Sequence, residues 1–223
     1  MFEILNNILA ITGFLGLIYS AFQWLYFNKI KFFLWFNKLF SWKRDVNFEL
    51  TILSSSTLSN LDQIAKYIRN KTKVESKIIS KSKDKIVFSY DTLIFQIAFD
   101  EFDENGYGLE IYIKNSNSTY KSAKLNLHRI GLILDDMEKD AIFKPSKFQF
   151  ISSFKKKNPF IGPSVSTIKI DNIKQFVMVL SSSVFDRITI ENDNDIQIGL
   201  NNISYVDTNY SEIKLVAEII LAF

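Results

Sequence analysis

The segment from residue 154 to residue 164, FKKKNPFIGPS, has the composition of an anion-binding loop. Its three lysines provide positive charge, its prolines fix the backbone angle φ, and amides near its glycine are free to bind an anion. These features predict a site for a small anionic ligand. The loop is not a P-loop, because the G-x-x-x-x-G-K spacing is missing. The alternative is a basic loop that faces solvent or lipid. The expected ligand-binding residues are Lys155, Lys156, Lys157, Asn158, Gly162 and Ser164.

Metal-binding patterns are weak in this sequence. His128 is the only histidine and cysteine is absent, so no set of zinc ligands is available. We expect His128 to be a partly buried structural residue. The acidic segments 101–106 and 191–195 resemble calcium loops, but Tyr112 stands where the first needs its bidentate glutamate, and the second lacks the glycine. We expect hairpin loops at both segments, and neither a metal nor a cofactor.

The sequence carries no catalytic signature. It has no G-x-S-x-G, H-E-x-x-H or G-x-G-x-x-G motif and no set of kinase motifs. The carboxylates of Asp135, Asp136, Glu138 and Asp140 are expected on a solvated helix face. An enzyme is therefore not expected, and a membrane-tethered enzyme with converging carboxylates ranks behind the hypotheses below.

The N-terminal segment predicts a membrane anchor over residues 1–28. Residues 8–27 form a run of twenty residues without a charge, and such a helix is about 30 Å long, the thickness of the hydrocarbon core. Trp24 and Tyr26 lie near one end, where amphipathic rings favour the interface. One alternative is a cleavable signal peptide, but its positive start and small-residue cleavage site are missing. The other is a buried helix of a soluble core.

A basic segment follows at residues 29–45. It mixes aromatic residues with five cations and suits a helix lying at the lipid headgroups. The alternative is a second, imperfect span through residues 30–42. All five cations follow the first span, so the positive-inside rule places the C-terminal domain in the cytoplasm, on a single-pass inner-membrane protein. The membrane-interface residues are Lys29, Lys31, Lys38, Lys43 and Arg44.

Charge is divided unevenly along the chain. Residues 1–44 have a net charge of +4, whereas the remaining residues carry 22 basic and 23 acidic side chains. The main domain is thus nearly neutral, and bulk binding of nucleic acid is not expected.

Small residues recur every four positions in the span, at Thr12, Gly16 and Ser20. This spacing lets helix backbones approach closely in lipid. We therefore expect self-association of the span and a homo-oligomer.

Residues 46–223 predict one α+β domain of mainly antiparallel sheet, with a long helix and a C-terminal helix packed on it. Its helices are expected near 59–71, with Ser59 and Asp62 as a capping box, at 118–143, ended by Pro145, and from Asn209 to the C-terminus. Its strands are expected near 46–53, 74–80, 85–90, 92–100, 107–114, 147–154, 165–170, 175–180, 185–191 and 195–200.

The helix at 118–143 carries a heptad-like apolar seam. Leu125, Leu132 and Ile133 widen this seam, which favours a helix packed across a sheet over a coiled-coil contact. The order of elements suggests two degenerate sheet-and-helix halves, and LSSS recurs at 53–56 and 180–183. Two such halves resemble the saddle of the TATA-binding-protein fold, although the second half lacks its first helix.

The layout of the chain is similar to that of small bacterial antiviral effectors that couple a membrane span to a cyclic-nucleotide-binding domain. The similarity rests on the span at 8–27, the basic run after it and the compact strand-rich domain. It implies a sensor or effector whose cytoplasmic domain binds a small anion, such as a cyclic nucleotide, or a protein, and then drives oligomerisation or membrane perturbation. The alternative is an assembly subunit of a membrane-bound complex.

Overall fold

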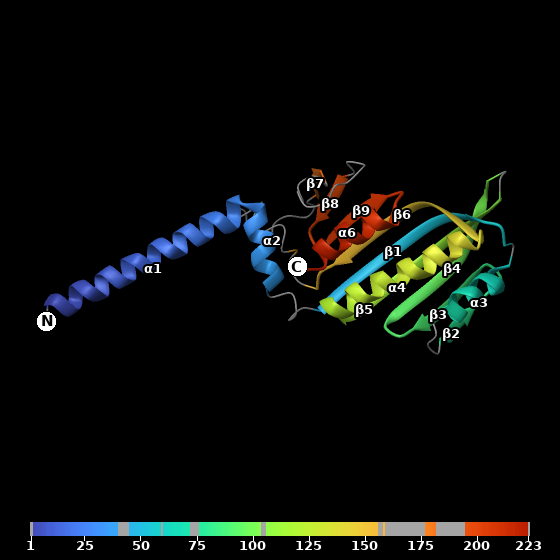
Figure 1. Ribbon diagram of the computed structural model, residues 1–223, viewed down its shortest axis with the longest axis horizontal. Coiled ribbons are helices and arrows are strands. Elements are labelled where there is room, and N and C mark those ends of the chain that lie inside the picture. The colour runs from blue at the N-terminus through green and yellow to red at the C-terminus, as the bar shows by residue number, and fades with distance from the viewer. Residues whose placement is uncertain are drawn as a thin grey trace.

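The computed structural model places a long N-terminal helix beside a sheet domain (Figure 1). Helix α1 (Phe2–Asn28) projects away from the domain, and the short helix α2 (Ile30–Leu39) turns sharply from its axis. The structure describes residues 2–39, 45–58, 60–71, 76–103, 106–155, 158, 177–181 and 195–222.

The domain is built on one antiparallel sheet, as the sequence predicts. Nine described strands follow the order β2-β3-β4-β5-β1-β6-β9-β8-β7. All of their pairings are antiparallel. The strands are β1 (Asp45–Ser56), β2 (Lys77–Lys81), β3 (Lys85–Tyr90), β4 (Leu93–Asp103), β5 (Gly106–Thr119), β6 (Phe143–Ser153), β7 (Val177–Ser181), β8 (Asp195–Gly199) and β9 (Asn202–Asp207).

The strand order repeats about the centre of the sheet. β1 and β6 pair there, with Leu50 opposite Phe150. β1 is flanked by β5, β4 and β3, and β6 is flanked in the same sense by β9, β8 and β7. This is the order expected of two sheet-and-helix halves. The LSSS repeat does not mark them, since Leu53 lies in β1 and Leu180 lies in β7. The strands expected at 165–170 and 185–191 lie outside the described residues.

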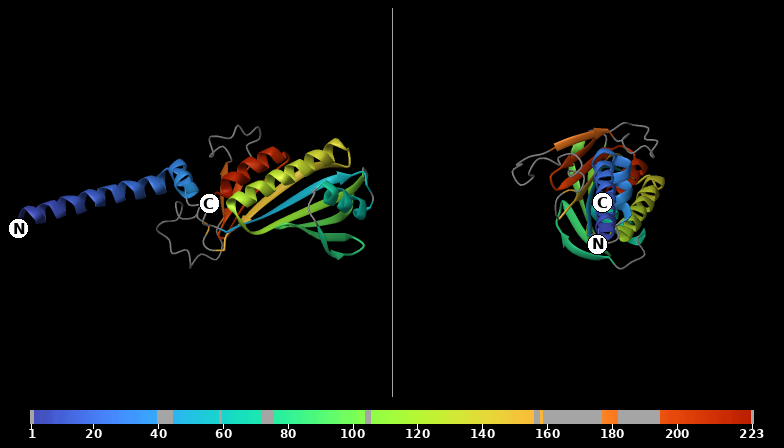
Figure 2. Two further views of the ribbon diagram at one scale, coloured as in Figure 1. Left: turned by 60° about the horizontal axis from the view of Figure 1, so that its bottom comes forward. Right: turned by 90° about the vertical axis from the view of Figure 1, so that its left-hand side faces the viewer.

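Three helices cover one face of the sheet: α3 (Leu61–Lys71), α4 (Tyr120–Lys139) and α6 (Tyr210–Ile220) (Figure 2). Alternate residues of the strands face these helices, and the other strand residues form an open face. In β1, for example, Phe48, Leu50 and Ile52 are fully buried. Burial of these apolar side chains is the main contribution to the stability of the domain.

The ends of the helices differ in part from the sequence prediction. Asn60 accepts a hydrogen bond from the Asp62 amide and caps α3, whereas Ser59 lies outside the described residues. α4 ends at Lys139, before Pro145, because Ala141 adopts a left-handed φ of 53° and turns the chain into β6. Asn209 caps α6 as predicted, accepting from the Ser211 amide at 2.8 Å.

The sequence prediction for this domain differs from the structure at two further points. It contains no strand over β9 (Asn202–Asp207), although Ile203 and Tyr205 alternate as in a strand. On α4, Leu125 and Leu132 are 47% and 53% exposed, so the buried seam is narrower than expected.

Candidate functional site

Helix α1 presents its apolar side chains to the surroundings. The stretch Asn6–Asn28 is long and apolar enough to cross a membrane, and none of its most apolar window is buried inside the molecule. Leu17, for instance, is 71% exposed. A soluble core helix would be covered by the domain, so that alternative does not fit. An exposed helix of this kind at the N-terminus is a possible membrane anchor or signal sequence.

Aromatic side chains join α1 to α2 and the domain. The rings of Phe22 and Phe36 meet edge to face at 4.9 Å, and those of Tyr26 and Phe33 at 5.0 Å. Phe33 is buried in the same cluster as the core of the domain. With ten residues α2 is about 15 Å long, which is too short for the second span considered above.

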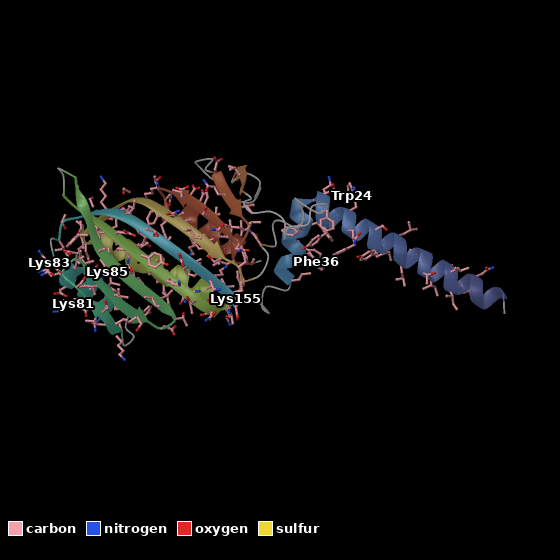
Figure 3. The ribbon with its side chains drawn as sticks, turned by 180° about the vertical axis from the view of Figure 1, so that it is seen from behind. Trp24, Phe36, Lys81, Lys83, Lys85 and Lys155 are labelled. Carbon is pink, nitrogen blue, oxygen red and sulfur yellow. The ribbon has the colours of Figure 1, made fainter. Side chains whose placement is uncertain are left out.

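The end of α1 has the features of a membrane interface. Trp24 is exposed at the end of α1 nearest α2 (Figure 3). The Lys29 amine lies 5.5 Å from the centre of the Trp24 ring, a cation–π contact. Trp35 on α2 is exposed as well. Of the other predicted interface residues, Lys43 and Arg44 lie outside the described residues, as do the side chains of Lys31 and Lys38.

The small-residue stripe lies open on α1. The Thr12 hydroxyl donates to the carbonyls of Ile8 and Leu9 in its own helix, at 2.9 and 3.0 Å. A Cβ added at Gly16 would meet nothing within 4 Å, and Ser20 is exposed. The Thr12 hydroxyl therefore needs no partner from another helix, and the small side chains of the stripe let a second helix approach closely.

The Lys155–Lys157 loop is described only in part. The Lys155 amine pairs with the Asp45 carboxylate at 2.9 Å, and both side chains are well exposed. Lys155 lies at the end of the domain nearest α2 (Figure 3). Asn158 is buried, and its amide donates to the carbonyls of Gly199 and Asn202, so it holds the β8–β9 turn. Lys156, Lys157, Gly162 and Ser164 lie outside the described residues.

A second basic site lies at the opposite end of the domain. Residues 66–85 carry eight basic and two acidic side chains in a chain whose net charge is only +3. The described ones lie in the second half of α3, in β2, in the turn after it and at the start of β3, and several of them border a groove of about 870 Å³. We call this groove the distal groove. Its lining combines the apolar residues Ala65, Ile78 and Ile86 with the cations Lys66, Arg69 and Lys77. One acidic residue, Asp62, also lines it.

The cations of the distal groove differ in how they are held. The Arg69 guanidinium donates to the Ser76 hydroxyl at 2.6 Å and to the Ser76 carbonyl at 3.1 Å, which fixes its position. Lys66 and Lys77 make no ion pair with any described residue. Such an arrangement attracts an anion without first breaking an existing pair.

Further lysines extend the positive field beyond the distal groove. Lys81, Lys83 and Lys85 gather at the end of the domain remote from α1 (Figure 3). Lys81 pairs with Asp62 at 2.6 Å. Sequence reasoning missed this site because the near-zero charge of the whole domain conceals the local excess over residues 66–85.

The remaining candidates have ordinary structural roles. His128 is exposed rather than partly buried, and its Nδ1 lies 3.5 Å from the Lys214 amine. No group of three metal-binding side chains occurs among the described residues. Asp103 pairs with Gly106 across the β4–β5 hairpin, as expected for this calcium-loop-like segment, and the segment 191–194 lies outside the described residues. Asp136 and Asp140 are solvated and pair with Lys71 at 3.3 and 3.8 Å.

No protein-family model matches the sequence, and no curated protein matches it.

Proposed function

We propose that this chain is a membrane-anchored sensor or effector whose sheet domain binds an anionic ligand. The observation that carries the proposal is the contrast between α1 and the domain. The described strands and helices of the domain bury an extensive apolar core, whereas α1 leaves its most apolar stretch uncovered. Apolar area of this extent is stabilised in lipid or against another apolar helix.

In this proposal α1 spans the bilayer once and α2 lies at its surface. The basic residues after α1, among them Lys29, favour the cytoplasmic side for the domain. Trp24, Trp35 and Lys29 sit at the depth of the headgroups, where aromatic rings and cations are favoured.

Two basic surfaces support an anionic ligand. Lys155 lies at the end of the domain nearest α2, and the distal groove lies at the other end. The layout resembles that of the small bacterial antiviral effectors described above, which favours a ligand such as a cyclic nucleotide. Ligand binding then changes the association of α1 through Thr12, Gly16 and Ser20.

The test is mass spectrometry of the full chain purified in mild detergent, first native and then after organic extraction. We expect a homo-oligomer that carries a small anion. Replacing Lys155, Lys156 and Lys157 with Ala, or Lys66 and Lys77 with Ala, identifies which basic surface holds it. A ligand-free monomer that also binds no added anion contradicts the proposal.

A second function, an assembly subunit of a membrane complex, is favoured by one observation. Leu125 and Leu132 on α4 and Leu215 on α6 are exposed on the outer surface of the helix layer. Exposed apolar residues of this size often mark a protein interface. Recovery of a stable hetero-complex with no affinity for small anions favours this function over the first.

A further inference from the structure

We infer that the distal groove and the free edge of β2 bind an acidic, extended segment of a partner protein, which adds a strand to the sheet. The inference rests on the proposed function, since it names the site and the class of the anionic ligand. Its basis is the combination at one place of an open strand edge, two exposed isoleucines, and two lysines that make no ion pair with any described residue.

The edge of β2 is open within the residues that the structure describes. β2 is the first strand in the sheet order and pairs only with β3. All five of its residues are exposed, and α3 packs chiefly on β3 and β4. An edge of this kind presents unpaired amides and carbonyls to a further strand.

Two adjacent isoleucines expose apolar surface at this edge. Ile78 is 45% exposed and lines the distal groove, and Ile79 is 55% exposed. The register with β3 shifts between Ile78 and Ser80, which places an irregularity at Ile79. Of these two isoleucines only Ile78 lines the groove, so a compact nucleotide bound there would contact Ile78 and leave Ile79 exposed. An extended peptide along the edge can cover both side chains.

The charge around β2 selects an acidic strand. Lys77 and Lys81 flank the two isoleucines, and Lys66 faces the same groove from α3. Pairing of two β2 edges brings these lysines together and is opposed by like-charge repulsion. The Asp62 carboxylate, which also lines the groove, pairs with Lys81 at 2.6 Å. A strand carrying glutamate or aspartate is attracted, since its carboxylates approach Lys66 and Lys77, which make no ion pair with any described residue.

The test uses a fluorescent peptide of about seven residues with alternating Glu and Val, enough to span β2, and the full chain in detergent. Anisotropy is expected to show binding that weakens as salt is raised. A second peptide has the same sequence but carries N-methyl groups along one edge, so it keeps the charge and loses backbone donors. It is expected to bind about tenfold more weakly if a strand is added.

Two matched double variants show where on the molecule the peptide binds. The pair Lys66→Glu and Lys77→Glu removes two cations that make no ion pair with any described residue, so we expect the variant to fold and peptide binding to fall by about tenfold or more. The control pair, Lys144→Glu and Lys147→Glu, changes two exposed lysines of β6 and leaves binding unchanged. Circular dichroism confirms that both variants are folded.

Two results overturn the inference. The first is that the acidic peptide does not bind, and the second is that the N-methylated peptide binds equally well, whether or not a nucleotide displaces it. If a small anion nevertheless co-purifies with the chain, the proposed function stands and only the strand-addition site fails. If neither a small anion nor the peptide binds, both proposals fail.

Discussion

The ring of Tyr210 lies directly over Gly131, so that a Cβ at residue 131 would meet the ring Cε1 at 2.8 Å. The Tyr210 hydroxyl also donates to the Leu127 carbonyl at 2.5 Å. Gly131 and Leu127 belong to α4, and Tyr210 begins α6, so this contact joins the helices of the two halves of the domain. Close packing at this point depends on the missing side chain of Gly131.

Replacing Gly131 with Ala tests this contact. Alanine is favoured over glycine in a helix by about 1 kcal/mol, but forced overlap in a packed interior costs about 1–3 kcal/mol. We therefore expect Gly131→Ala to lower the free energy of unfolding by about 1 kcal/mol, measured by urea denaturation. In the background of Tyr210→Leu the same change is expected to be neutral or stabilising. Stabilisation in both backgrounds contradicts the packing described.

Ala141 is a position where the backbone is strained. Its φ of 53° is left-handed, a conformation that costs a residue with a Cβ about 1–2 kcal/mol. We expect Ala141→Gly to raise the free energy of unfolding by about 1 kcal/mol. Asn117, with φ 53°, is the matched control, because asparagine tolerates this conformation and gains less from replacement by Gly. An equal gain at both positions argues against strain at Ala141.

The raised pKa of Tyr112, which lies on the open face of the sheet, predicts that the free energy of unfolding falls at alkaline pH. Burial, together with a hydrogen bond to the Glu49 carboxylate, raises the pKa of Tyr112 to about 12. The folded chain then keeps this proton between about pH 10 and pH 12 while the unfolded chain releases it, so stability falls as pH rises through this range. We expect Tyr112→Phe to reduce that fall.

The titration of Tyr112 can be observed directly. The ultraviolet difference between the native chain and the Tyr112→Phe variant isolates the tyrosinate of Tyr112. We expect it to form near pH 12. Its formation near the ordinary pKa of 10.0 contradicts the interaction with Glu49.

The small-residue stripe of α1 predicts that a bulky side chain at Gly16 prevents self-association of the helix. Gly16→Leu places a bulky side chain on the surface where a second helix approaches, so we expect the oligomer to dissociate toward monomer in native mass spectrometry. Ala10→Leu adds similar bulk to another face of α1 and is expected to leave the oligomer intact. Equal effects of the two changes show that the stripe is not the contact.

Much of the fold could be predicted from the sequence because the alternation of apolar and polar residues that marks a strand lies within the strand itself. Strand β3 was predicted at the observed residues, and the predicted ends of β8 fall within one residue of those observed. The end of α4 could not be predicted, since it is set by the left-handed turn at Ala141 rather than by Pro145.

The candidate site was harder to predict than the fold. Whole-domain charge hides the excess at residues 66–85, and only the tertiary fold brings Lys66 of α3 and Lys77 of β2 to one groove. Asn158 has the residue type of a ligand contact, but the fold uses its amide to hold the β8–β9 turn. Backbone partners of this kind lie some forty residues away and leave no local pattern.

The most direct test of the central claim, that α1 anchors the chain in a membrane, is the intact mass of the protein recovered from membranes washed in alkaline carbonate. We predict that the full chain of 25.9 kDa stays in the membrane pellet. Recovery in the soluble fraction, or a mass shortened by loss of α1, contradicts the claim.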